Sequence, residues 1–402
     1  DFMNMLIIGN GFDLAHERPT TYVDFLGFAK SIMRIQTFTG NQVEFQASLS
    51  GLKKDVREYV LDLREETTVS QVNGQVRTNN RTLLEIWDRL DKNVWYDYFV
   101  AIWENDLIRG KNWIDFEREI LEVIDFFDHG IKNVYSPISN DVETETDSNR
   151  DMDKLNQFWR LFRAKMRQED GKKCLWFDFI DKTYQDLQDL VRCLEIYLDD
   201  CVGKMPIINH SPDIQELEIY SVLSFNYTTI PTDVYPSLTN THYIHGQAVA
   251  SRSAQKNNMV LGVNEYWDNS EKDFRTNFNS YKKFVQRIIK DTGIGYKSAL
   301  KEMLTEHKNS DHLRAQTKVY IGSRYNNVYI FGHSLDITDG DILREVMRTQ
   351  GIITTIFYRH KQQQATQIAN LSKVLGQEEL LKCVFSVSPT IIFKQQVDME
   401  KL

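Results

Sequence analysis

The chain has 402 residues, of which 41% are hydrophobic, and a formal net charge of −9 at pH 7. This length is enough to bury a large core and predicts about two to three domains, or one elaborated α/β domain. The acidic balance and the absence of any long Lys/Arg run disfavour nucleic acid as a partner, because nucleic-acid binders usually carry a basic surface.

The four cysteines show neither the paired spacing of a zinc ribbon nor that of a dense disulfide framework. Free thiols fit a reducing cytosol, and no signal peptide precedes the first apolar segment, so we expect a cytoplasmic protein. No apolar run reaches the ~20 residues that cross a bilayer, and we expect no membrane association. The histidines show no HxxxH or HExxH spacing, so no metal is expected.

The first predicted element is a strand over Met5–Ile8, where apolar residues follow one another as in a strand buried on both faces. Gly9 and Gly11 come next, and apolar residues at helical spacing then run from Phe25 to Ile32. A strand, a glycine loop and a helix in this order are the usual start of a nucleotide-binding α/β fold.

The segment from about 50 to 205 is predicted to be helical. Large apolar residues recur at helical spacing within 113–127, 155–166 and 184–198, which places them on one face of each helix. The acidic stretch 136–153 is predicted to be a solvated loop between two of these helices.

After residue 216 the pattern changes to short apolar runs separated by helical segments at 274–306 and 339–350. Strands that alternate with helices predict a mostly parallel sheet. The predicted strands are 220–223, 243–244, 259–261, 328–331 and 352–358.

The predicted fold class is therefore α/β, with a Rossmann-like, mostly parallel sheet and a large helical insertion. The expected division has three parts. They are the first strand–loop–helix unit at 3–50, the helical insertion at 51–215, and the remainder of the nucleotide-binding domain at 216–402.

The glycine loop after the first strand is the first candidate binding site. Gly9 and Gly11 allow the backbone to approach a phosphate, and Asn10 and Asp13 can bond ribose hydroxyls. The third glycine of the dinucleotide fingerprint is missing, because Leu14 stands at its place. The alternative is a tight turn in which Asn10 or Asp13 caps the next helix.

Two polar residues follow later strands and are candidates for catalysis. Asn226 and His245 come after the runs at 220–223 and 243–244, and we expect them at the same edge of the sheet. A histidine can take a proton near neutral pH, and an asparagine offers a donor and an acceptor to a ribose or a water. Alternatively, the asparagine forms a turn and the histidine satisfies structural hydrogen bonds.

Further candidates follow the strands at 259–261 and 328–331. Gly332 allows close approach of a ligand, and Ser334 can bond phosphate or ribose. Gly262 is a similar strand-end glycine, for which a plain turn is the alternative. Asp339 and Asp341 begin the predicted helix at 339–350 and are interpreted as capping residues.

Taken together, these segments resemble the bacterial abortive-infection AbiH family. The resemblance lies in Ile7–His16 with Pro19–Tyr22, and in the later segments Phe225–Thr228, Ile244–Gly246 and Phe331–Asp336. It extends over nearly the whole chain in order, and the helical middle is its least distinctive part.

The same order of motifs is similar, more distantly, to sirtuin-like NAD-binding proteins. The resemblance implies that Gly9 and Gly11 lie in the NAD loop, that Asn226 binds ribose or water, and that His245 is the catalytic histidine. It also places Gly332 and Ser334 on the adenosine side and matches Gly262 to the glycine that follows the His-Gly pair. The cysteines of the sirtuin zinc module are missing, which disfavours protein deacylation.

The resemblance therefore implies an antiphage effector that hydrolyses NAD, as its substrate, to nicotinamide and ADP-ribose. Such an enzyme has to be held inactive until infection, which implies a phage-derived trigger, and the aromatic-rich helical block offers a surface for a homo-oligomer. Two alternatives are kept: a non-catalytic sensor that binds NAD or ADP-ribose, and a partner-dependent toxin acting through carboxylates and a metal. The absence of a clear DxD or ExK cluster disfavours the second.

Overall fold

The computed structural model describes residues 3–38, 40–69, 76–130, 149–169, 176–263, 278–317 and 325–401. The chain divides into two compact units. The first unit contains residues 1–20, 203–248 and 290–402, and the second contains 21–202 and 249–289. Residues 136–148 of the predicted acidic loop lie outside the described residues, whereas 149–153 belong to a helix.

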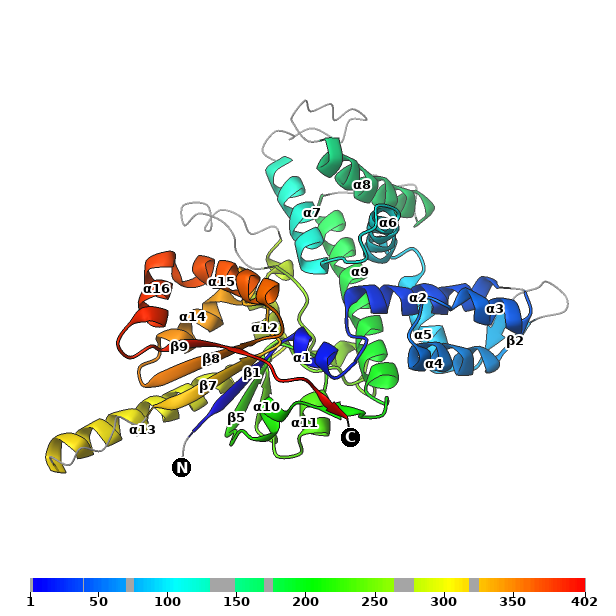
Figure 1. The fold of residues 1–402 in the computed structure, drawn as a ribbon. Coiled ribbons are helices and arrows are strands. Elements are labelled where there is room, and N and C mark those ends of the chain that lie inside the picture. The colour runs from blue at the N-terminus through cyan, green and yellow to red at the C-terminus, as the bar shows by residue number, and fades with distance from the viewer. Residues whose placement is uncertain are drawn as a thin grey trace. The chain divides into compact units, whose positions relative to one another are not determined.

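The first unit is built on a six-stranded sheet in which every pairing is parallel (Figure 1). Its strand order is β6-β5-β1-β7-β8-β9, which is the 3-2-1-4-5-6 order of dinucleotide-binding folds. The predicted Rossmann-like α/β class is thus confirmed. The strands are β1 (Met5–Ile8), β5 (Ser221–Ser224), β6 (Thr241–Tyr243), β7 (Asn326–Phe331), β8 (Ile352–Tyr358) and β9 (Ile391–Gln395).

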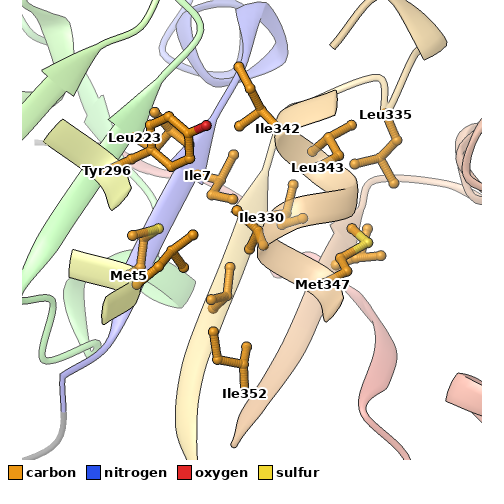
Figure 2. Packing of buried hydrophobic residues seen from close by; sticks show 14 of the residues in the cluster. Met5, Ile7, Leu223, Tyr296, Ile330, Leu335, Ile342, Leu343, Met347 and Ile352 are labelled. Carbon is orange, nitrogen blue, oxygen red and sulfur yellow. The ribbon is translucent and has the colours of Figure 1, made fainter. Parts of the chain in front are cut away.

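One face of this sheet packs against helices that alternate with its later strands in the chain. Met5 and Ile7 of β1 point to this face together with Ile330 of β7, and all three are buried (Figure 2). Burying each such side chain stabilises the fold by about 1.5–3 kcal/mol. The covering helices are α13 (Gly295–Thr317), α14 (Gly340–Arg348), α15 (Lys361–Leu375) and α16 (Gln377–Phe385).

Leu6 and Ile8 alternate with these residues along β1 and are also fully buried. On that face Phe12 of the short helix α1 (Asn10–Ala15) packs edge-on against Phe331, with ring centroids 6.0 Å apart. Burial on both faces explains why β1 is uniformly apolar. The other small elements of this unit are β4 (Asn209–His210), α10 (Pro212–Gln215), α11 (Ile230–Val234), the 3-10 turn η5 (Ile337–Asp339) and β10 (Glu400–Lys401), of which β4 and β10 pair antiparallel.

The second unit is helical, as predicted for the middle of the chain. Its core is aromatic: the rings of Phe99 and Phe116 stack at 4.0 Å, and those of Trp95 and Phe158 lie 4.7 Å apart. Its elements are α2 (Tyr22–Thr37), α3 (Gln42–Ser48), α4 (Lys54–Glu65), the hairpin β2 (Thr67–Val69) and β3 (Val76–Thr78), α5 (Arg81–Leu90), α6 (Val94–Ile108), α7 (Phe116–Gly130), α8 (Asn149–Glu169), α9 (Trp176–Ile196), the π-helical turn η2 (Tyr197–Val202), the 3-10 turns η3 (Ala254–Lys256) and η4 (Asn279–Tyr281), and α12 (Lys283–Ile289).

The boundaries of the two units differ from those of the three expected segments. Helix α2, which the sequence placed with the first strand in 3–50, belongs to the second unit, and so do residues 249–289 of the segment 216–402. Thr21 starts α2 through a capping box with Asp24, and the predicted face of Phe25 and Ile32 is buried.

The strand expected over 259–261 is wrong. Met259–Leu261 is buried but forms no strand, because the side-chain amide of Gln286 pairs with Leu261 instead: it donates to the Leu261 carbonyl at 2.8 Å and accepts from its N–H at 3.2 Å. The helical segment expected over 274–306, of which 274–277 lie outside the described residues, contains two helices, α12 and α13, and between them Asp291 and Gly293 adopt φ of 49° and 75°. Positive φ interrupts a right-handed helix. Among the helices of the described residues, none is long and apolar enough to span a membrane.

Candidate active site at the carboxyl edge of the sheet

The loops that follow β1 and β7 meet backbone to backbone. The N–H of Gly9 donates to the Phe331 carbonyl at 3.3 Å, and the N–H of Gly11 donates to the Gly332 carbonyl at 2.8 Å. A Cβ on Gly11 would lie 2.7 Å from the Gly332 oxygen, and one on Gly332 would lie 2.1 Å from the Phe12 nitrogen. Glycine is therefore required at positions 11 and 332 because the two backbones approach so closely. The N–H groups of Gly9 and Gly11 are used in the hydrogen bonds between them.

A buried carboxyl group lies next to the glycine loop. Asp13 is only 1% exposed, and its carboxylate accepts hydrogen bonds from Asn226 Nδ2 at 2.9 Å and from Thr228 Oγ1 at 2.8 Å. Burial raises the pKa of Asp13 to about 7, although the hydrogen bonds from Thr228 and Asn226 and the charge of Arg18 lower it. This carboxyl therefore changes its charge near neutral pH.

Asn226 joins the end of β5 to the loop after β1. Its Nδ2 donates to the Gly9 carbonyl at 2.9 Å as well as to Asp13 Oδ1 at 2.9 Å. An amide nitrogen has two protons, so both donors are used within the protein. The chemistry left to the Asn226 side chain is that of an acceptor, through Oδ1, for a ribose hydroxyl or a water.

His245 follows β6 and pairs with an acid from another part of the chain. Its Nε2 lies 3.1 Å from Asp339 Oδ1, and both residues are buried. Asp339 stands directly before α14 but makes no side-chain hydrogen bond to the start of that helix. The capping interpretation of Asp339 is therefore wrong, because its carboxylate is turned toward histidine instead. Asp341, in contrast, is exposed in the first turn of α14, where a negative charge suits the helix dipole.

A second histidine reaches the same carboxylate. His333 is 3% exposed, and its Nε2 lies 3.5 Å from Asp339 Oδ2. The Phe225 ring lies beside both imidazoles, with centroid distances of 4.4 Å to His333 and 5.5 Å to His245. The candidate active site therefore contains one carboxylate between two buried histidines, enclosed on one side by an aromatic ring.

A separate hydrogen-bond chain supports helix α1. His16 Nδ1 lies 2.8 Å from the Phe12 carbonyl and therefore donates to it, and His16 Nε2 accepts from the Tyr235 hydroxyl at 3.1 Å. The Tyr235 oxygen in turn accepts from the Ser211 N–H at 2.7 Å. Burial lowers the pKa of His16 to about 4, so this histidine is neutral at physiological pH.

The remaining candidates differ in exposure. Asn10 is exposed and accepts from the Thr20 hydroxyl at 2.6 Å, and the Ser334 side chain is also exposed at the carboxyl edge. Gly262 belongs to the second unit, where a Cβ would lie 2.1 Å from the Tyr281 carbonyl oxygen. A close approach of Tyr281 thus accounts for glycine at position 262.

The structure brings five of the sequence-derived candidates into contact: Asn226 bonds Gly9 and Asp13, and Gly11 bonds Gly332. His333, Asp339 and Thr228 were not among the candidates. A weak signal was present, because His333 follows a strand-end glycine and Thr228 lies two residues after Asn226. Over the described ranges no group of three His, Cys, Asp or Glu residues is arranged to hold a metal ion.

The 3-2-1-4-5-6 sheet, with its polar groups collected at the carboxyl ends of the strands, defines a Rossmann-like α/β protein. The chain belongs to the family described as bacteriophage abortive infection AbiH, whose model matches residues 5–359. The predicted family is confirmed, and it places the protein in phage defence by abortive infection. No curated protein matched the sequence. No solved structure matched it either.

Proposed function

We propose that the protein acts in abortive infection by hydrolysing NAD to nicotinamide and ADP-ribose. The observation that carries the proposal is the buried pair of His245 and Asp339, 3.1 Å apart, at the carboxyl edge of a dinucleotide-type sheet. Ligands of open α/β sheets bind at this edge, near the position where the strand order reverses. Here that position is between β1 and β7, where the Gly9–Gly11 loop meets Gly332.

The substrate is proposed to lie across the loops after β1 and β7. The Gly9 and Gly11 amides face β7, so the polar side chains of Asn10 and Ser334 are the groups that offer exposed contacts to phosphate or ribose. The nicotinamide ribose would then face Asn226 and His245. Asn226 would accept a hydrogen bond through Oδ1, since both of its amide protons are donated to Gly9 and Asp13.

Cleavage of the nicotinamide–ribose bond passes through an oxocarbenium-like state, as in glycoside hydrolysis. The water oxygen forms the new bond to C1′, the bond from C1′ to the pyridinium nitrogen breaks, and nicotinamide leaves as a neutral molecule. The water proton goes to His245. With Nε2–H donating to Asp339, the lone pair of the neutral imidazole is on Nδ1, which is the atom that takes the proton.

The test is incubation of the purified protein with NAD, followed by mass analysis for nicotinamide and ADP-ribose. His245→Ala should lower kcat by ~10²–10⁴-fold, the usual contribution of a general base. His312→Ala, an exposed histidine of α13, is the matched control and should retain wild-type turnover. Wild-type turnover in His245→Ala would exclude the assigned base.

Asn226 has its own control in Thr228. Both side chains donate one hydrogen bond to Asp13, so Asn226→Ala and Thr228→Val weaken the same support. We expect Asn226→Ala to reduce kcat/KM by at least ~10²-fold and Thr228→Val by no more than ~10-fold, because only Asn226 also contacts the substrate. Equal losses in kcat/KM would show that Asn226 acts only by holding Asp13 in place.

Asn226 donates both of its amide protons within the protein, so it has no donor left for a substrate. This favours a second candidate function, a nucleotide sensor. A sensor would bind NAD or ADP-ribose in calorimetry and release no product, including after addition of lysate from phage-infected cells. Release of nicotinamide only after that addition would instead indicate an enzyme that requires a trigger. A parallel incubation with RNA and a divalent metal tests the toxin alternative.

A further inference from the structure

We propose that Asp339 is a positioning residue shared by His245 and His333, and that only His245 of the two can act as the base. The assignment of a base rests on the proposed function, whereas the positions of the protons follow from contacts within the protein. The sequence contains no pattern that joins these residues, since they come from the ends of β6 and β7 and from the start of α14.

The backbone fixes the proton of His333. The N–H of Leu335 donates to His333 Nδ1 at 2.9 Å, and an atom that accepts a hydrogen bond carries a lone pair. The single proton of this neutral imidazole is therefore on Nε2, which faces Asp339 Oδ2 at 3.5 Å. His333 cannot receive a second proton on Nδ1 without losing the bond from Leu335.

The turn that carries this bond has an unusual backbone. Gly332 and Leu335 both adopt left-handed conformations, with φ of 68° and 59°. A left-handed leucine is strained and persists only where its surroundings hold it. Leu335 is fully buried among the residues that pack on the sheet, and its N–H bonds His333. Packing of the Leu335 side chain therefore keeps the His333 ring in one orientation.

The fixed ring in turn orients the carboxylate. With Oδ2 of Asp339 toward His333, Oδ1 is directed at His245 Nε2. Asp339 Oδ1 accepts from His245 Nε2 at 3.1 Å, so His245 carries its own proton on Nε2 and its lone pair on Nδ1. When Nδ1 takes a proton, the new positive charge lies beside a buried carboxylate, where the attraction is stronger than in water.

The test uses protein labelled with ¹⁵N in its histidine rings, because protonated and unprotonated ring nitrogens differ in chemical shift. His245→Ala and His333→Gln assign the two signals. At pH 7.5 we expect the Nε2–H tautomer for both rings of the wild-type protein. Asp339→Asn should shift His245 toward the Nδ1–H tautomer, leave His333 unchanged, and lower kcat by ~10²–10⁴-fold with KM within ~3-fold. Asp341→Asn, the same change two residues away at an exposed position, is the control.

An Nδ1 proton on His245 or His333 in the wild-type protein would overturn the inference, and this measurement requires no substitution to fold. An unchanged His245 tautomer in a folded Asp339→Asn protein would overturn it as well. If the wild-type protein leaves NAD intact while both rings show the expected tautomers, the proposed reaction fails and the positioning role of Asp339 stands.

Discussion

Asn226 Nδ2 lies 2.9 Å from Asp13 Oδ1, and this hydrogen bond joins two residues that are 213 positions apart in the chain. The same nitrogen bonds the Gly9 carbonyl, so one amide group connects the end of β5 with the end of β1 and with helix α1. Asp13 thus depends on neutral donors and on Arg18 for its stabilisation inside the fold.

Asp13 gives the protein a pH-dependent stability of known sign. Its pKa is about 7 in the fold and near 3.8 when the carboxyl is in water. Between about pH 4 and 7 the folded state binds more protons than the unfolded state, so the free energy of unfolding falls as pH rises. A shift of this size corresponds to a loss on the order of 4 kcal/mol across the window.

Asp13→Asn should remove this slope, because the amide keeps an acceptor for Asn226 and the Thr228 hydroxyl can rotate to accept from it. Urea unfolding at several pH values between 4 and 8 measures the difference between variant and wild type. Parallel pH profiles of the two proteins would show that Asp13 does not titrate in this range.

His16 is expected to act in the opposite direction. Its pKa falls from 6.5 to about 4 on folding, so the unfolded state binds more protons between these values and stability rises with pH. The contribution is complete above about pH 6.5 and amounts to roughly 3 kcal/mol. In His16→Gln the amide oxygen still accepts from Tyr235, but the pH dependence between 4 and 6.5 should disappear in the same urea series. A variant with the wild-type slope would contradict the neutral state of His16.

Gly332→Ala should be among the most destabilising single changes in the first unit. The substitution combines a left-handed backbone, with φ of 68°, and a Cβ 2.1 Å from the Phe12 nitrogen. Gly376 provides a comparison without a clash, since its φ is also positive, at 89°, and no atom lies within 4 Å of its Cβ position. We expect Gly376→Ala to cost about 1–3 kcal/mol and Gly332→Ala more than ~3 kcal/mol in urea unfolding. Equal costs would mean that the two loops separate without penalty.

The fold was largely predictable because its central strands are apolar on both faces. The predictions at 220–223, 328–331 and 352–358 correspond to β5, β7 and β8 within a few residues. Strand β9 was not predicted, because its apolar pattern is weak. It lies at the edge of the sheet, and three of its five residues are exposed. At 259–261 a strand was predicted where none forms. There the backbone of Leu261 is hydrogen-bonded by the side chain of Gln286 and not by a neighbouring strand.

The candidate site was predictable only where residues directly follow strands. Asn226, His245 and Gly332 were identified in this way, because a parallel sheet brings all strand ends to one edge. Asp339 could not be identified in this way, because an acid before a helix is usually a cap. Only the folded chain shows that its carboxylate bonds His245 and lies 3.5 Å from His333.

The central position of β1 has a consequence for how the protein is made. Met5 pairs with Ser221 on one side and with Val328 on the other, so β1 is synthesised long before either of its neighbours in the sheet. At ~5–20 residues per second, synthesis of the intervening chain takes on the order of tens of seconds. Throughout that time His245, His333 and Asp339 have not come together, so a chain that ends before Asp339 lacks the candidate site.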